Sequence, residues 1–293
     1  MNALVRTHAA RPATFTVDAE DEHGATVPTA IAGEHPLTLY LDKRELVTLM
    51  TLGGAPEELA VGWLRNQRLL ASVDEIATVQ VDWDVDAVSV TTRSMAHDGV
   101  AHWDGPSRDS GALDDRLSRR TVTTGCGQGT MFGSLMDEVD AVRLPQDARL
   151  TEDTLQTVID RVRRHESIYK VAGAVHGCAL CGNAGDLRGE IIAFVEDVGR
   201  HNAVDAIAGR MWLEGIGGED KLFYTTGRLT SEMVIKCAQM GIPFLLSRSG
   251  LTEMGWRIAQ RVGMTMIGRC QGRHYLLFTG RERFVRTRPA AVA

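Results

Sequence analysis

Cys126 stands in a run of small residues, Thr123-Thr124-Gly125-Cys126-Gly127-Gln128-Gly129-Thr130. Three glycines in five positions give the backbone access to positive φ and remove side-chain cover, so the Cys126 sulfur and nearby N–H groups are expected to face an incoming reactant. The competing interpretation is a glycine-rich turn whose cysteine is a small apolar filler, because most cysteines are buried and inert. The spacing alone leaves both interpretations open.

Three clusters of polar residues follow apolar runs that resemble strands. In an α/β sheet, ligands gather at the carboxyl ends of strands and at the helix starts that follow them. The first cluster has two acids, a base, an imidazole and an amide within seven residues, and helix capping does not require that density of function. Its members are Glu196, Asp197, Arg200, His201 and Asn202. We therefore expect a binding or catalytic role here, with a salt-bridged capping cluster as the alternative.

The other two clusters are candidate anion sites. Between Thr225 and Glu232, backbone N–H groups, hydroxyls and Arg228 could hold a phosphate, although Glu232 could equally cap the helix. The last cluster follows a strand and carries two arginines in a glycine-containing turn, for which a solvated hairpin turn is the alternative. It comprises Arg269, Cys270, Gln271, Gly272, Arg273 and His274.

Three other cysteines have weaker claims to chemistry. Cys178 and Cys181 have C-x-x-C spacing with His176 two residues upstream, a pattern seen in zinc sites and redox pairs. A structural zinc site needs four ligands, and a nucleoside-deaminase site needs His-x-Glu followed by Pro-Cys-x-x-Cys, which this chain lacks. Structural thiols are therefore the preferred interpretation, and Cys237, on the apolar face of a predicted helix, is assigned to the core.

The apolar pattern predicts a loose tail at residues 1–12, a small α+β domain at residues 13–118 and an α/β domain at residues 119–288. In the first domain we expect strands at 37–41, 76–81 and 87–92 and a helix at 56–68. In the second we expect strands at 171–175, 190–195, 221–225, 242–247 and 264–267 and helices at 151–163, 202–213, 230–240 and 252–262. This alternation implies three layers around a largely parallel or mixed sheet.

The composition is that of an ordinary globular protein, with 44% hydrophobic residues and a net charge of −6. The acidic balance argues against a general affinity for nucleic acid or anionic lipid. No apolar run approaches the roughly 18 residues that a membrane helix needs, and residues 1–14 lack a signal-peptide core, so a cytoplasmic protein is expected. Five cysteines, an odd number, are poor material for a disulfide framework, which directs attention to thiol chemistry.

Taken together, these blocks resemble the FdhD family, sulfur carriers required for formate dehydrogenase activity. The most specific block runs from Val195 to Asp205 and is similar to the family signature EDVGRHNA-D. Supporting blocks follow in the family's order: Thr124-Gly125-Cys126-Gly127, Gly173-Ala174-Val175-His176, residues 226–233, Gly241-Ile242-Pro243 and residues 275–284.

The resemblance implies a cytidine-deaminase-like α/β/α fold without the deaminase zinc, preceded by a smaller domain, and usually a homodimer. It also implies that persulfide sulfur is taken from a cysteine desulfurase and passed to the molybdenum bis(guanine dinucleotide) cofactor before that cofactor enters formate dehydrogenase. Cys126 matches the family's persulfide carrier, and residues 269–274 match the segment that binds the dinucleotide portion. Arg228 is expected to meet phosphates, and Gly125 and Gly127, with Arg200 or His201, to stabilise the thiolate.

Gly129 departs from the family pattern, because most members have a second cysteine three residues after the first. Either Cys126 carries sulfur as a single thiol or the pair Cys178 and Cys181 compensates. A second hypothesis is a chaperone that shelters the molybdenum cofactor while Cys126 is incidental. A third is a zinc deaminase, although no zinc is expected.

Overall fold

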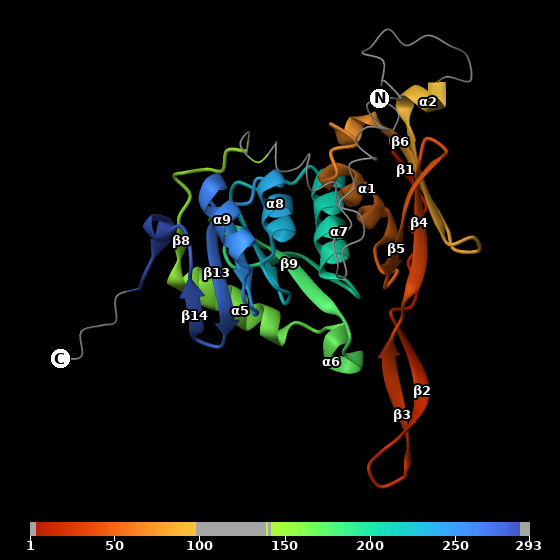
Figure 1. Cartoon of the computed structure of the whole chain (residues 1–293), viewed down its shortest axis with the longest axis horizontal. Helices are drawn as coiled ribbons and strands as arrows, with labels where there is room; N and C mark the ends of the chain where they lie inside the picture. The colour runs from red at the N-terminus through yellow and green to blue at the C-terminus, as the bar shows by residue number, and fades with distance from the viewer. Residues whose placement is uncertain (1–3, 98–138, 140–141, 288–293) are drawn as a thin grey trace, which may run out of the picture. The chain divides into compact units, whose positions relative to one another are not determined.

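The computed structural model describes residues 4–97, 139 and 142–287, which fall into two compact units (Figure 1). Unit 1 comprises residues 4–97, 167–176 and 195–215, and unit 2 comprises residues 139, 142–166, 177–194 and 216–287. The chain therefore leaves unit 1 and returns to it twice. The predicted domain boundary near residue 118 and the glycine-rich run around Cys126 lie outside the described residues.

Unit 1 contains a five-stranded mixed sheet in the order β1-β6-β7-β4-β5 and a separate two-stranded ribbon, β2-β3. The pairs β1/β6 and β4/β7 are parallel, whereas β6/β7, β4/β5 and β2/β3 are antiparallel. The strands are β1 (Val5–Arg6), β2 (Thr14–Glu20), β3 (Thr26–Ala32), β4 (His35–Leu41), β5 (Arg44–Thr51), β6 (Ile76–Asp82) and β7 (Ala87–Thr92). The helices are α1 (Pro56–Asn66), α2 (Arg93–His97), α6 (Ile168–Ala172) and α7 (Arg200–Leu213), with a 3-10 turn at Val73–Glu75.

Helices α1 and α7 approach so closely that their backbones touch. A Cβ atom on Gly62 of α1 would lie 1.7 Å from the carbonyl oxygen of Asp205, and a Cβ atom on Gly209 of α7 would lie 1.9 Å from the carbonyl oxygen of Glu58. No side chain fits at either distance, because protein interiors are already close-packed. Glycine at both positions is therefore a requirement of this crossing.

Polar contacts reinforce the same crossing. The Nδ2 of Asn66 donates a 2.6 Å hydrogen bond to Oδ1 of Asp205, and both side chains are buried. Nη1 of Arg65 donates a 2.9 Å hydrogen bond to the carbonyl oxygen of Ala208. The apolar core of unit 1 lies between these helices and the sheet, with Leu59, Trp63 and Leu64 of α1 packed against residues of β4 to β7.

The N-terminal residues are bound to unit 1, so the expected loose tail is wrong from residue 4 onward. Val5 and Arg6 pair in parallel with Thr78 and Val79 of β6. The buried carboxylate of Glu57 accepts hydrogen bonds from the Thr7 hydroxyl and the Ala9 N–H at 2.8 and 2.9 Å. A strand of two residues has no periodicity to detect, and such long-range polar contacts leave no local pattern.

Unit 2 contains a six-stranded mixed sheet in the order β10-β9-β11-β12-β13-β14. The pairs β11/β12 and β12/β13 are parallel, whereas β9/β11 and β13/β14 are antiparallel. The strands are β9 (His176–Gly182), β10 (Ile191–Asp197), β11 (Lys221–Thr225), β12 (Phe244–Ser247), β13 (Thr265–Gln271) and β14 (His274–Leu277), and β8 (Leu150–Thr151) pairs in parallel with β15 (Phe284–Val285). The helices are α5 (Glu152–Arg164), α8 (Ser231–Gln239) and α9 (Glu253–Val262), with 3-10 turns at Gly185–Leu187 and Arg281–Arg283.

Helices cover both faces of this sheet (Figure 1). Leu155, Val158 and Ile159 of α5 are buried against one face, where their neighbours include Cys181 and Leu222. Helices α8 and α9 pack on one another on the other face. The predicted helix at 151–163 is confirmed, and Thr151 caps it, because its hydroxyl accepts from the Thr154 N–H at 3.2 Å.

The strand predicted at 171–175 is wrong. These residues follow or end α6, and Gly173, with φ of +64°, terminates that helix. The carboxylate of Glu196 accepts hydrogen bonds from the N–H groups of Ile168 and Tyr169 at 2.5 and 3.2 Å, which stabilises the first turn of α6. The apolar composition of residues 171–175, with valine at both ends, favoured a strand. The hydrogen bonds from Glu196 stabilise the helix instead.

The remaining elements follow the prediction closely. Strands β7 and β11 have the predicted bounds, and the other predicted helices and strands differ by a few residues at their ends. Within the described residues, no helix is both long and apolar enough to cross a membrane. The architecture is therefore a mixed α/β protein with a sheet in each unit.

The α1–α7 crossing gives the first testable prediction. Gly209→Ala should destabilise the protein, because overpacking costs about 1–3 kcal/mol and this exceeds the gain of about 1 kcal/mol in helix propensity. For a chain of this size we expect the melting temperature, followed by circular dichroism, to fall by about 5 °C.

The matched control is Gly54→Ala in the same unit, where an added Cβ meets nothing within 4 Å. Its melting temperature should stay at the wild-type value. An unchanged melting temperature for Gly209→Ala would show that the two helices can separate without loss.

Candidate functional site

The first polar cluster lies at the end of β10 and the start of α7, in unit 1. Asp197 is buried, and its Oδ2 accepts hydrogen bonds from the Thr51 hydroxyl at 2.5 Å and the Leu52 N–H at 3.2 Å. Its Oδ1 accepts from Asn202 Nδ2 at 2.9 Å and from the Gly199 N–H at 3.3 Å. Burial raises the pKa of Asp197, while the four donors oppose that rise. This carboxylate therefore joins the end of β5 to the start of α7.

Other members of this cluster also hold backbone. Nδ2 of Asn202 donates a second hydrogen bond, of 2.7 Å, to the carbonyl oxygen of Met50. Glu196 is committed to the first turn of α6. Arg200 and His201 lie in the first turn of α7 and are 7% and 6% exposed. The structure thus brings all five predicted residues together, and it gives the two acids and the amide a structural task.

The C-x-x-C pair lies on β9 with its side chains on opposite faces of the sheet. Cys178 is opposite Thr225 of β11 and donates a hydrogen bond to the Thr225 hydroxyl at 3.3 Å. Cys181 is opposite Leu222 and belongs to the core beneath α5. Strand residues three apart are separated by about 10 Å, which is too far for a disulfide. The pair therefore cannot act as a dithiol in this fold.

All four described cysteines are buried: Cys178, Cys181 and Cys237 are 0% exposed and Cys270 is 2% exposed. Burial raises the pKa of Cys181 and of Cys270 to about 12, and it raises the pKa of Cys237 well above its usual value. Thiols with such pKa values are protonated and unreactive near neutral pH. Within the described residues, no group of three His, Cys, Asp or Glu side chains is placed to hold a metal ion.

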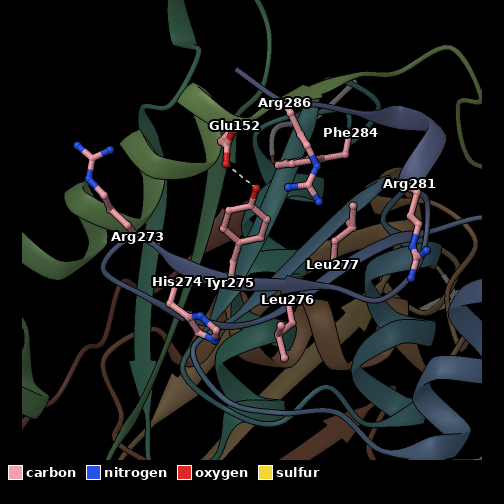
Figure 2. A pocket seen from close by; sticks show the side chains of 9 residues that line it. All are labelled: Glu152, Arg273, His274, Tyr275, Leu276, Leu277, Arg281, Phe284 and Arg286. Carbon is pink, nitrogen blue, oxygen red and sulfur yellow. Dashed lines mark hydrogen bonds between the residues drawn. The ribbon is translucent and has the colours of Figure 1, made fainter. Parts of the chain in front are cut away.

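Unit 2 carries a cavity of about 710 Å³ beside β14 (Figure 2). Its walls come from the start of α5, from β14 and from the segment around β15. The lining residues are Glu152, Arg273, His274, Tyr275, Leu276, Leu277, Arg281, Phe284 and Arg286. Of the predicted ligand-binding residues, the structure places Arg273 and His274 in this cavity.

A tyrosine and a carboxylate are coupled at one side of the cavity. The Tyr275 hydroxyl donates a 2.5 Å hydrogen bond to Oε1 of Glu152, and the Thr287 N–H donates a 3.1 Å bond to Oε2 (Figure 2). Burial and this hydrogen bond to Glu152 raise the pKa of Tyr275 to about 12. The ring of Tyr275 also meets Phe284 edge-on, with centroids 5.5 Å apart. Tyr275 is therefore a neutral, fixed wall of the cavity at physiological pH.

The charge around the cavity favours an anion. Three exposed arginines, Arg273, Arg281 and Arg286, line it against the single carboxylate of Glu152. Arg286 also lies over the Phe284 ring, 5.9 Å from its centroid. Guanidinium groups bind phosphate with paired hydrogen bonds, and aromatic rings provide a stacking surface. The arginines therefore make this cavity suited to an anionic group such as a phosphate.

The other predicted ligand-binding residues lie elsewhere on unit 2. Arg228 is exposed in the loop after β11, beside the N–H of Gly227 that donates to the Thr225 hydroxyl at 3.1 Å. Arg269 is exposed at a bulge in β13, with φ of +55°, and Cys270 is buried in the core. Gln271 ends β13, and Gly272 and Arg273 form the exposed turn to β14, so the hairpin alternative for this segment is what the structure contains.

Sequence reasoning missed seven residues of the cavity: Glu152, Tyr275, Leu276, Leu277, Arg281, Phe284 and Arg286. Glu152 lies in the first turn of α5, where an acid is favourable without any further role. Three arginines and one phenylalanine within residues 281–286 were the available signal. Its meaning depends on β15 pairing with β8, which brings this segment beside the start of α5.

The fold and the cavity define a mixed α/β protein with an arginine-lined cavity and, among the described cysteines, buried thiols. A family model described as the FdhD/NarQ family matches residues 32–285. Because this match covers most of the chain, the protein belongs to the FdhD/NarQ family.

Individual relatives agree with this membership. The chain is 28% identical over 260 residues to the sulfur carrier protein FdhD of Listeria monocytogenes, covering 88% of this chain and 92% of that protein. It is 26% identical over 251 residues to the sulfur carrier protein FdhD of Bacillus subtilis, covering 85% and 88%. A crystal structure from Desulfotalea psychrophila, described as a formate dehydrogenase accessory protein, is similar with a TM-score of 0.69 and 25% identity, covering 94% of this chain and all of that one.

The burial of the described cysteines gives the second testable prediction. In the native protein at pH 8, a thiol reagent such as 5,5′-dithiobis(2-nitrobenzoate) should react quickly with one equivalent of thiol, because four of the five cysteines are buried in the folded protein. Absorbance at the product wavelength gives the count. The Cys126→Ala variant should show no fast equivalent, and denaturant should expose all the remaining thiols.

Two or more fast equivalents in the folded wild-type protein would contradict this prediction. The double variant Cys178→Ala, Cys181→Ala serves as the control. Its fast phase should have the same amplitude as that of the wild type.

Proposed function

We propose that this protein is a sulfur carrier that takes persulfide sulfur from a cysteine desulfurase on Cys126 and passes it to the molybdenum bis(guanine dinucleotide) cofactor required by formate dehydrogenase. The observation that carries the proposal is the burial of the other four cysteines, which leaves Cys126 as the thiol available for the reaction. The names of the curated relatives support the same role.

In the loading step, the Cys126 thiolate attacks the terminal sulfur of the persulfide on the desulfurase. A new sulfur–sulfur bond forms at Cys126 as the donor's sulfur–sulfur bond breaks, and the donor cysteine leaves as a thiolate. No net oxidation occurs. An ordinary cysteine is only a few per cent ionised at neutral pH, so Gly125 and Gly127 are proposed to favour the thiolate through backbone N–H groups.

In the delivery step, the terminal sulfur goes to the molybdenum cofactor, which is the substrate. A metal takes sulfur as sulfide, so two electrons from a thiol reductant accompany the transfer, and Cys126 returns to the thiolate. The proposed holding site for the dinucleotide portion is the cavity of unit 2, where Arg273, Arg281 and Arg286 supply positive charge. Arg228, Arg269 and His274 are proposed as further contacts.

The proposal also concerns the fold of unit 2, the association of the protein with itself and with formate dehydrogenase, and the number of thiols that carry sulfur. The sheet order β10-β9-β11-β12-β13, with β9 antiparallel to β11, supports a cytidine-deaminase-like arrangement in unit 2. A homodimer and an association with formate dehydrogenase are proposed with it. The missing second cysteine at Gly129 means that a single thiol does the work, because Cys178 and Cys181 are enclosed on opposite faces of the sheet.

Persulfide loading is the direct test of this function. Incubation with a cysteine desulfurase and cysteine should add about 32 Da, one sulfur atom, to the peptide that contains Cys126 in mass spectrometry. Cys126→Ala should abolish the adduct and the activation of formate dehydrogenase while leaving the melting temperature unchanged. The control variant Cys178→Ala, Cys181→Ala should still carry the adduct on Cys126.

The same measurement distinguishes a sulfur carrier from the alternative, a cofactor-binding chaperone. A protein that activates formate dehydrogenase without ever carrying the adduct would be a cofactor-binding chaperone. Full activation by Cys126→Ala would rule out transfer through that thiol.

The cavity gives a separate prediction for ligand binding. Guanosine diphosphate should bind to the wild-type protein, and Arg286→Ala should weaken it by about tenfold, because a charge-assisted hydrogen bond contributes about 1.5–3 kcal/mol. Isothermal titration calorimetry at low salt measures both affinities. The control is Arg257→Ala, an exposed arginine of α9 that pairs with Glu253 outside the cavity. Equal affinity of the two variants for guanosine diphosphate would contradict nucleotide binding in this cavity.

A further inference from the structure

The β2-β3 ribbon of unit 1 has one apolar face. Strand residues alternate between faces, and the register pairs Phe15 with Ile31, Val17 with Thr29 and Ala19 with Val27. These six side chains therefore lie on the same side of the ribbon. Four of them are large and exposed: Phe15 at 45%, Val17 at 39%, Val27 at 42% and Ile31 at 44%.

Helix α6 packs against β3, yet the four large apolar side chains of this face keep 39–45% of their surface exposed. The ribbon is a two-stranded sheet separate from the five-stranded one, and it runs on beyond the ends of β4 and β5 (Figure 1). A two-stranded ribbon is marginally stable in water without packing on one face. Exposed apolar patches of this kind mark places where another molecule packs.

The edges of the ribbon are protected, in contrast to its face. The Gly33 N–H donates to the Ala13 carbonyl, and the Asp21 N–H donates to the Ala25 carbonyl. These two pairs are therefore hydrogen-bonded pairs of the ladder, and every second pair between them is hydrogen-bonded too. Pro28, opposite Asp18, belongs to a non-hydrogen-bonded pair, so its backbone nitrogen points away from β2 toward the free edge of β3. Proline has no N–H, so this edge lacks a hydrogen-bond donor at that position. On β2, Asp18 and Glu20 occupy outward-facing positions and add charge to the other edge. A partner is therefore expected on the face rather than along an edge.

The charge of the ribbon indicates the chemistry of that partner. Residues 12–42 contain no lysine or arginine, whereas Asp18, Glu20, Asp21 and Glu22 are concentrated at the far end of the ribbon. The ribbon of a second copy would offer these carboxylates no lysine or arginine to pair with. The complementary surface is instead an apolar patch with a rim of lysine and arginine on a different protein.

We infer that the apolar face of the β2-β3 ribbon docks the protein that supplies the persulfide. The inference rests on the proposed function, in which the donor sulfur is attached to a protein. Loading therefore requires contact between two proteins, whereas the acceptor is a cofactor. The ribbon provides a surface for that contact with one apolar face and an acidic far end.

The experiment compares two donors on matched variants. Val17→Asp places a charge on the apolar face, and Thr16→Asp places the same charge one residue away on the polar face, starting from a side chain of nearly equal shape. Ile31→Asp repeats the change on β3. Sulfur loading of Cys126 is measured against carrier concentration with a cysteine desulfurase and cysteine, and separately with glutathione persulfide, which needs no docking.

We expect Val17→Asp and Ile31→Asp to raise the KM for loading from the desulfurase by at least about tenfold, the size of effect found for central interface residues. Their kcat and their rate with glutathione persulfide should match the wild type. Thr16→Asp should stay within about twofold of the wild type in every measurement, since Thr16 lies on the polar face, away from the proposed contact. Thermal unfolding confirms that each variant is folded.

Wild-type KM values for both Val17→Asp and Ile31→Asp would overturn the inference that the donor protein docks on this face. A matching loss with glutathione persulfide would also overturn it, because the defect would then lie in the thiol and not in recognition. Failure of the wild-type protein to load from either donor is a different outcome, which overturns the proposed function and the assigned partner with it.

Discussion

Helices α1 and α7 touch through their backbones at Gly62 and Gly209, and much of unit 1 is arranged around that contact. The contact fixes the axis of α7, and so it fixes where the first turn of α7 begins. Asn66 and Asp205 then form a buried hydrogen bond beside the crossing. The segment with the most conspicuous sequence in the chain is thus held by two residues that have no side chain.

The cluster at the start of α7 shows how a dense polar motif can be structural in large part. Asp197 accepts four hydrogen bonds, two of them from the end of β5, and Glu196 completes the first turn of α6. A buried carboxylate with four donors is costly to replace, because removing it leaves several donors unsatisfied. These side chains therefore determine the path of the backbone. Chemistry assigned to this motif falls to Arg200 and His201, which are also buried at the helix start.

Much of the fold could be predicted from the sequence, because its helices and central strands have strong periodicity. The amphipathic stripe of α5 and the apolar run of β11 needed no other information. Residues 171–175 and the two residues of β1 could not be predicted, since their structure is decided by Glu196 and by pairing with β6. The cavity was found only in part, because Glu152 and Arg286 meet through the pairing of β8 with β15. Cys126, the residue with the strongest sequence signal, lies outside the described residues.

Neither unit is a continuous stretch of the chain. The core of unit 1 includes α1, from the N-terminal part, and α7, which ends at Leu213. During synthesis, the first hundred residues therefore leave the ribosome without α7, the helix that completes their packing. More than a hundred further residues must be synthesised before α7 is available. Contacts of such long sequence separation slow folding and expose apolar surface in the meantime. A nascent chain of this protein is thus a natural client for a chaperone until α7 has been made.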